Sequence, residues 1–195
     1  MPNRQTTVRQ LLDRFGTTYA DEAGITLRDK PSPLYQLLVL ATLLSARIRA
    51  DIALSAAREL FAAGLRTPQR MLDATWQERV DALGRGGYVR YDESTATRLG
   101  EGARLLLESY RGDLRRMRSP HREIQQFSGI ADVGADIFCR EVQAVWPRLR
   151  PFFDQRALAA ARHHGLPADP RELATLVKPD QVASLAAALV RSTLK

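Results

Sequence analysis

Apolar residues in this chain recur at intervals of three and four, and no strand-length run alternates between apolar and polar residues. This spacing predicts helices, the first of which carries Val8, Leu11 and Phe15 on one face. The segment from Pro33 to Ala46 is apolar on most faces, so we expect it to form a buried central helix with its proline in the first turn. The pattern excludes sheet-based folds and predicts an all-α protein.

Capping signals divide the chain into about ten helices. Helix starts are expected at Thr67-Pro68, at the capping box from Thr75 to Glu78, near Asp92, at Ser119-Pro120, near Val133, at Asp154, at Asp169-Pro170 and at Pro179-Asp180. Gly64 and Gly84 mark expected helix ends. We expect the two tryptophans, Trp76 and Trp146, to anchor the core. No repeat period or low-complexity linker interrupts this pattern.

The chain has few cysteine and histidine side chains that could bind a metal ion. Cys139 is the single cysteine, which excludes an intramolecular disulfide, a cysteine-ligated zinc and an iron–sulfur cluster. His121, His163 and His164 are the three histidines, and the adjacent pair would point to different sides of a helix. Solvated or capping histidines are therefore favoured over a metal site, and we expect no metal and no cofactor.

Composition and hydropathy are those of a soluble globular protein, with 45% hydrophobic and 26% charged residues. The longest apolar stretch, Leu37 to Leu44, is far shorter than a membrane span. The start of the chain, Met1 to Gln10, is polar and lacks the apolar core of a signal peptide. We therefore expect a cytoplasmic location and no membrane partner.

The chain is strongly basic, since 29 lysines and arginines against 22 acidic residues give a formal net charge of +7. Such a charge favours a polyanionic partner. The segment from Arg111 to Arg122 is especially basic, because it contains five arginines and Asp113 as its one acidic residue. A solvated helix end explains this segment equally well unless a neighbouring motif supports binding.

A neighbouring motif follows directly. The segment from Ile124 to Phe138 consists of two helical halves joined at Ser128 to Ala131. Phe127 and Ile137 are placed to pack the two halves together, and Gly129 permits a tight turn that exposes backbone N–H groups at the next helix N-terminus. A turn of this kind binds a phosphate well.

The arginines and the turn together predict a helix-hairpin-helix that holds a nucleic-acid backbone without reading its sequence. The candidate contact residues are Gly129, Ile130, Ala131, Gly134, Arg118 and Arg122. As an isolated pattern Gly-Ile-Ala is weak, because most turns of this kind simply join two helices.

Several segments, in the same order, resemble those of the helix-hairpin-helix DNA glycosylase superfamily, especially its endonuclease III branch. They are Pro33-Leu34-Tyr35 through Arg47, Thr67-Pro68 to Leu72, Gly87-Tyr88 to Ala96, Phe127 to Ala135, and Pro151-Phe152-Phe153-Asp154 with Arg156. The co-linear set is more specific than any one of its members, and it spans most of the chain.

The resemblance implies a two-part all-α architecture with double-stranded DNA in a cleft between the parts. Residues 31–134 would form a helical barrel that ends in the helix-hairpin-helix. Residues 1–30 and 135–195 would form the second part. The resemblance also suggests a monomer, and DNA as the partner would place the protein at the nucleoid.

Asp154 falls where the resemblance places a catalytic aspartate. A carboxylate beneath the sugar would stabilise the positive charge that develops as an N-glycosidic bond breaks, and would orient water. The alternative is a plain helix N-cap, which is a common position for aspartate. One residue can serve both roles.

Removal of a base also requires the nucleotide to leave the stack and the gap to be filled. Arg47 stands where the resemblance places a gap-filling glutamine, and its planar guanidinium can stack. Tyr88 and Tyr91, on a glycine-flanked loop, are candidates for lining the base pocket or touching the opposite strand, with surface aromatics as the alternative.

Three positions depart from the family pattern. Val133 stands where bifunctional members carry a nucleophilic lysine, so we expect no Schiff-base lyase activity. Ala131 replaces a second glycine and would be strained by about 1 kcal/mol if the turn needs a positive φ there. Asp132 would repel a nearby phosphate. The absence of a four-cysteine loop does not argue against function.

Three hypotheses result. The first is a monofunctional DNA-repair glycosylase that hydrolyses the N-glycosidic bond of a damaged or mismatched base. The second is a catalytically inactive protein that binds damaged or bent duplex DNA. The third is an unrelated helical regulator. Val133, Ala131 and Asp132 favour the second hypothesis, whereas Asp154 and Arg47 favour the first.

Overall fold

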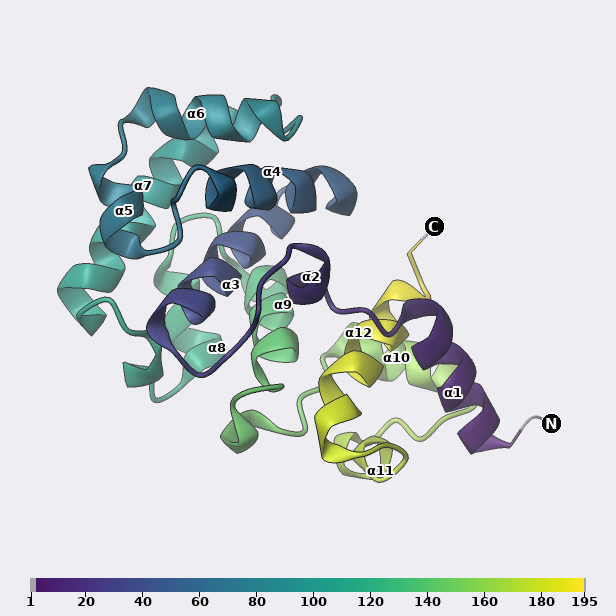
Figure 1. Cartoon of the computed structure of the whole chain (residues 1–195). Helices are drawn as coiled ribbons and strands as arrows, with labels where there is room; N and C mark the ends of the chain where they lie inside the picture. Colours follow the sequence, from purple (N-terminus) through teal and green to yellow (C-terminus); the bar gives the residue numbers. More distant parts are fainter. Residues whose placement is uncertain (1–2, 195) are drawn as a thin grey trace. The chain divides into compact units, whose positions relative to one another are not determined.

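The computed structural model describes residues 3–194, and this part of the chain contains helices and no strand (Figure 1). The α-helices are α1 (Arg4–Phe15), α2 (Tyr19–Glu22), α3 (Pro31–Leu44), α4 (Ala50–Ala62), α5 (Pro68–Asp73), α6 (Trp76–Arg85), α7 (Asp92–Tyr110), α8 (Pro120–Glu123), α9 (Asp132–Val142), α10 (Gln155–His163), α11 (Pro170–Ala174) and α12 (Val182–Arg191). Short 3₁₀ turns occupy Leu114–Arg116, Ile124–Gln126, Pro147–Leu149 and Pro179–Gln181. The all-α prediction is confirmed. None of the described helices combines the length and the apolar character that a bilayer crossing requires.

The chain divides into two compact units, which we call the hairpin unit and the terminal unit. The hairpin unit is Glu22–Phe138, and the terminal unit combines Met1–Asp21 with Cys139–Lys195. The sequence-based division placed 22–30 and 135–138 on the other side of the boundary.

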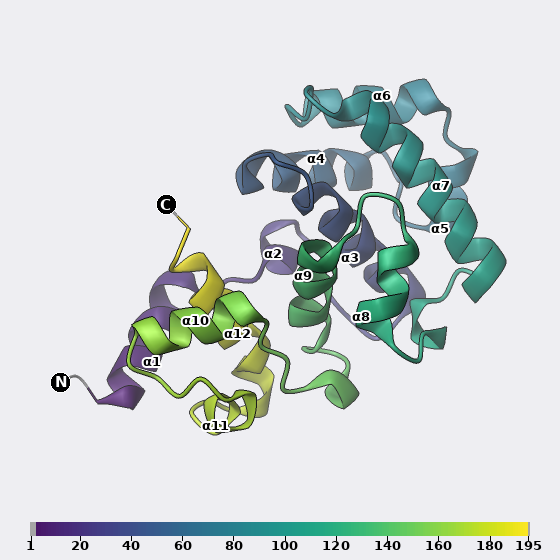
Figure 2. The ribbon, with the colours of Figure 1, turned by 180° about the vertical axis from the view of Figure 1, so that it is seen from behind.

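The hairpin unit is built around α3, whose residues from Leu37 to Leu43 are all buried. Figure 2 shows α3 beside α4 from behind. This helix packs on α4, α4 packs on α6, and α7 packs on both α5 and α6. Local capping supports the arrangement, because Thr67 caps α5 and Thr75 forms a complete capping box with Glu78 at the start of α6. The apolar faces and caps in the sequence thus account for most of this unit.

The terminal unit joins the two ends of the chain in one core. Val8 and Leu11 of α1 pack in a cluster with α10 and α12, to which Leu158 and Leu185 belong. Glu141 fastens α2 to this unit, because its buried carboxylate accepts hydrogen bonds from the backbone nitrogens of Tyr19 and Ala20 at 3.1 and 3.0 Å. Burial raises the pKa of Glu141.

The structure differs from the sequence-based prediction at several points. Helix α3 begins at Pro31, before Pro33, and the polar stretch before it contains α2, which the pattern missed. Trp146 is buried as predicted, but the prediction for Trp76 is wrong, since this residue is 41% exposed. Its indole N–H donates to the hydroxyl of Thr97 on α7 at 3.1 Å, so it is held at the surface and not in the core.

Candidate nucleic-acid interface

The predicted hairpin connects α8 and the following 3₁₀ turn to α9. Gly129 is exposed and adopts a φ of +91°, a conformation that favours glycine. Ile130 is buried, and its amide donates to the carbonyl of Phe127 at 3.0 Å, which closes the turn. Ala131 is exposed but does not have a positive φ, so the alanine that replaces the second glycine is not strained. The turn needs one glycine only.

A contact between His121 and Asp136 links the two halves of the hairpin, and one half also packs against α7. The imidazole Nε2 of His121 on α8 lies 2.8 Å from a carboxylate oxygen of Asp136 on α9. Phe127 and Ile137 are both buried, and their packing against each other stays a prediction. Gly102 of α7 offers the flat surface for the phenyl ring, because a Cβ there would lie 3.4 Å from Phe127. The turn is therefore exposed, while residues on either side of it are packed against the rest of the hairpin unit.

Arg98 is an interface residue that the sequence analysis missed. It lies on α7, and a Cβ built on Gly129 would be 3.0 Å from its Cδ atom, so its side chain packs against the turn. Arg98 also lines a cavity of about 10 Å³ with Tyr35 and Ser128. The sequence offered no signal for this residue, because only the packing of α7 brings position 98 to the hairpin.

Gly134 is needed for helix packing, and its predicted DNA contact stays a prediction. It is buried, and a Cβ at this position would lie 3.0 Å from Ile130 and closer still to the hydroxyl oxygen of Ser45. The missing side chain therefore lets α9 approach the end of α3. Arg47 follows two residues after Ser45 and is exposed, so the structure brings its segment close to the hairpin helix.

All five arginines of the arginine-rich segment are exposed, namely Arg111, Arg115, Arg116, Arg118 and Arg122. Arg115 pairs with Asp113 at 2.8 Å, and this hydrogen-bonded partner holds the pKa of the Asp113 carboxyl below its usual range. Arg118 and Arg122 are exposed on either side of the start of α8, in the approach to the turn. Their charges remain available to a polyanion.

Tyr88 is a core residue, and the prediction that it contacts DNA is corrected on this ground. Its side chain is fully buried, and its hydroxyl donates to the carbonyl of Leu43 at 3.0 Å. Burial raises the pKa of Tyr88. Tyr91 is half-buried with its ring centroid 6.5 Å from that of Tyr88, and Arg90 stacks on its ring.

Asp154 lies in the terminal unit at the N-terminus of α10. One carboxylate oxygen accepts the amide of Ala157 at 2.9 Å, which confirms the N-cap. The other oxygen forms an ion pair with the guanidinium of Arg140, in which the side chains of Asp154 and Arg140 are 2% and 4% exposed. Both oxygens are therefore already engaged.

The segment before Asp154 is fixed by a buried amide. Gln143 accepts a hydrogen bond from the backbone N–H of Phe152 and donates to its carbonyl, both at 2.8 Å. Gln143 also donates to the carbonyl of Arg140 at 3.0 Å, so one side chain joins the two segments that supply the ion pair. The carboxylate of Asp154 is held in place by these contacts, and a catalytic role for it stays a prediction.

Val133 is 55% exposed in the first turn of α9, so an aliphatic side chain stands at the surface beside the hairpin. Among residues 3–194 there is no group of three or more histidine, cysteine, aspartate or glutamate side chains arranged to hold a metal ion.

Comparison with known proteins shows the fold. No family model matches the sequence, and no curated protein matches it. Among solved structures, a trapped covalent intermediate of endonuclease III with DNA, in an estranged-adenine complex, matches with a TM-score of 0.54 and 15% identity. A non-covalent endonuclease III–DNA complex matches with a TM-score of 0.55 and 16% identity. Each match covers 97% of this chain and 85% of the other. The chain therefore has an endonuclease III-like all-helical fold.

Proposed function

We propose that this protein binds double-stranded DNA through its hairpin unit and that it serves in DNA repair, at the nucleoid of the cytoplasm. The proposal rests mainly on the exposed turn at Gly129. This turn packs against the rest of the hairpin unit and follows the exposed arginines Arg118 and Arg122. Both structural neighbours described above are complexes of endonuclease III with DNA, which supports the choice of partner.

The chemistry of the turn suits a phosphate. The first amides of a helix have no acceptor within the helix, so those at the start of α9 are available to an anion. Asp132 reduces this attraction because its carboxylate is exposed at the same helix end. The flanking arginines therefore supply most of the attraction to the backbone, which makes the binding independent of sequence and sensitive to salt.

Base removal is the second candidate function, with Asp154 as its candidate catalytic residue. The endonuclease III-like fold and the position of Asp154 before α10 favour it. However, a carboxylate that supports an oxocarbenium-like transition state must be accessible to the sugar. Because the side chain of Asp154 is 2% exposed and paired with Arg140, we infer a DNA-binding protein that does not excise bases.

The arginines are tested by the dependence of binding on salt. In the double variant Arg118→Gln/Arg122→Gln, the slope of log K against log salt is expected to fall by about 2, since each lost phosphate contact removes about 0.9. Fluorescence anisotropy with a labelled duplex, at several salt concentrations, measures this slope. Arg70→Gln removes an exposed arginine of α5 and serves as the matched control. An unchanged slope in the double variant would place the DNA contact elsewhere.

The catalytic question is tested separately. Duplexes with a panel of damaged or mismatched bases are expected to bind without base release, as revealed by hot alkali, because Asp154 is occupied by Arg140. Borohydride is also expected to trap no adduct with an abasic duplex, because Val133 is not a nucleophile. Base release that disappears in Asp154→Asn would establish the second candidate function in place of the first.

A further inference from the structure

The hairpin unit contains an open pocket that the proposed DNA contact does not use. It has a volume of about 300 Å³ and lies between the α5–α6 connection and α7. Its lining residues are Leu72, Ala74, Trp76, Arg79, Thr97, Gly100, Glu101 and Arg104. This volume is at the lower end of the range of about 300–1,000 Å³ typical of small-molecule sites.

Arg79 places a buried positive charge in the wall of this pocket. The residue is 9% exposed, and its Nη1 donates to the carbonyls of Met71 and Ala74, each at 2.9 Å. Its Nε has no hydrogen-bond partner, and no carboxylate forms an ion pair with Arg79 within residues 3–194. Burial lowers the pKa of Arg79. The guanidinium therefore lacks the counter-charge that a buried cation needs.

Gly100 makes room for this guanidinium. A Cβ at position 100 would lie 2.9 Å from Nη2 and 3.1 Å from Cζ of Arg79, so the charged plane lies directly against the glycine of α7. Arg104 is exposed one turn further along α7, and Glu101 is the one acidic residue in the lining. The two arginines outnumber that carboxylate, which leaves the pocket net positive.

Trp76 gives the pocket an aromatic wall. The hydrogen bond from its indole N–H to Thr97 fixes the ring, while the large exposed fraction leaves apolar surface open to a ligand. An exposed, immobilised tryptophan beside arginines is suited to stacking a planar base. The packing of the unit does not require a tryptophan at this exposed position.

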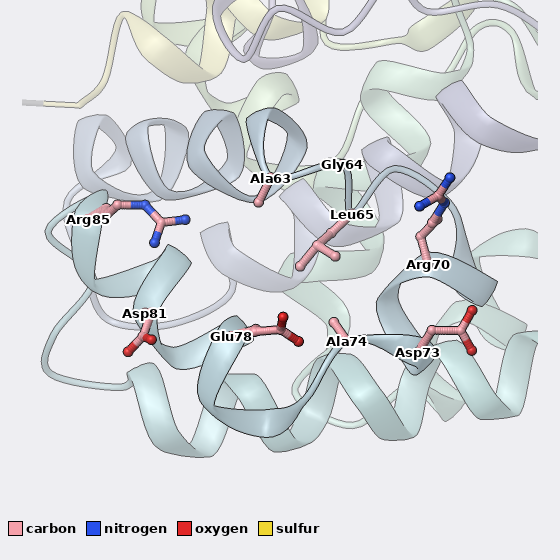
Figure 3. A pocket seen from close by; sticks show the side chains of 9 residues that line it. All are labelled: Ala63, Gly64, Leu65, Arg70, Asp73, Ala74, Glu78, Asp81 and Arg85. Carbon is pink, nitrogen blue, oxygen red and sulfur yellow. The ribbon is translucent and has the colours of Figure 1, made fainter.

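A second pocket in the same unit provides a contrast (Figure 3). It has a volume of about 500 Å³ and is lined by Ala63, Gly64, Leu65, Arg70, Asp73, Ala74, Glu78, Asp81 and Arg85. Three carboxylates stand there beside two arginines, and each carboxylate accepts a hydrogen bond from a residue of its own helix or helix cap. This second pocket therefore has no excess of positive charge to attract an anion.

We propose that the pocket of Trp76, Arg79 and Arg104 binds a nucleoside monophosphate, with the base on Trp76 and the phosphate on the exposed Arg104, in a pocket whose wall also holds the charge of Arg79. The phosphate supplies the counter-charge that Arg79 lacks, and the base covers the exposed indole. The size of the pocket limits the ligand to about one nucleotide. This site requires no duplex and is independent of the DNA contact at the hairpin.

Isothermal titration with deoxyadenosine monophosphate tests the affinity. Trp76→Ala is expected to weaken binding by about fivefold or more, since stacking on one aromatic ring contributes at least this much. Arg104→Gln is expected to weaken it by about tenfold, as removal of a charge-assisted hydrogen bond does. Arg70→Gln, in the pocket of Figure 3, is the matched control and should leave the affinity unchanged. Arg79 is kept intact because it also holds two carbonyl groups.

The two indole N–H signals in a ¹⁵N-resolved NMR spectrum locate the ligand. The signal of Trp76 is expected to shift during the titration, whereas that of the buried Trp146 stays in place. Inorganic phosphate and deoxyadenosine are titrated separately, and each should bind more weakly than the nucleotide. Equal affinity for either fragment would overturn the proposal, as would unchanged binding in Trp76→Ala or Arg104→Gln. If Trp76→Ala weakens duplex binding equally, the pocket belongs to the DNA surface and the proposal also fails.

Discussion

Replacement of Arg140 by methionine is expected to lower the free energy of unfolding of the terminal unit by about 3–5 kcal/mol. The variant leaves the carboxylate of Asp154 buried without its counter-charge, and the remaining hydrogen bond from Ala157 compensates only part of the loss. Urea denaturation, followed by circular dichroism and by the fluorescence of Trp146, measures the change.

Two further variants distinguish the effect of the missing counter-charge on stability from the effect of changed side-chain packing. Arg156→Met changes an exposed arginine of α10 and is expected to stay within about 0.5 kcal/mol of the parent protein. Adding Asp154→Asn to Arg140→Met should restore part of the lost stability, because asparagine is neutral and remains a good N-cap. A cost below about 1 kcal/mol for Arg140→Met would mean that the pair behaves as a surface ion pair.

Replacement of Gly86 by alanine is expected to cost about 3 kcal/mol, the upper part of the range for overpacking. A Cβ at this position would lie 2.5 Å from the backbone nitrogen of Ala56 and 2.9 Å from the carbonyl carbon of Ser55. These atoms belong to the middle of α4, so relief requires the whole helix to move. Thermal unfolding of the variant measures the cost.

Gly84 is the matched control for that substitution. It lies in the last part of α6, and a Cβ there meets nothing within 4 Å. Gly84→Ala is therefore expected to stabilise the protein by about 0.5–1 kcal/mol through the better helix propensity of alanine. If both alanine variants had the same effect, close approach of α6 to α4 would not explain the glycine at position 86.

The features that the sequence predicted well are local ones. The caps at Thr67, Thr75 and Asp154 and the turn at Gly129 each depend on residues within a few positions of one another. The all-α fold was predicted for the same reason, since helical spacing is visible within a single segment. Such signals need no knowledge of how segments pack.

The features that sequence reasoning missed depend on tertiary contacts. Arg140 and Asp154 are separated by a turn and a 3₁₀ segment, so their pairing follows from the path of the chain and not from their spacing. Tyr88 appeared to be a loop residue, but the glycines before it allow the loop to fold into the core. Trp76 shows the reverse error, because a large apolar side chain is not always internal.

The joining of α1 to α12 has a consequence for synthesis on the ribosome. The hairpin unit is one continuous segment and can begin to fold as soon as residue 138 has left the exit tunnel. The partners of Val8 and Leu11 include α10 and α12, which are synthesised after the hairpin unit, so the apolar face of α1 stays uncovered until these helices emerge. Chaperone binding to nascent chains should therefore be concentrated on this first helix.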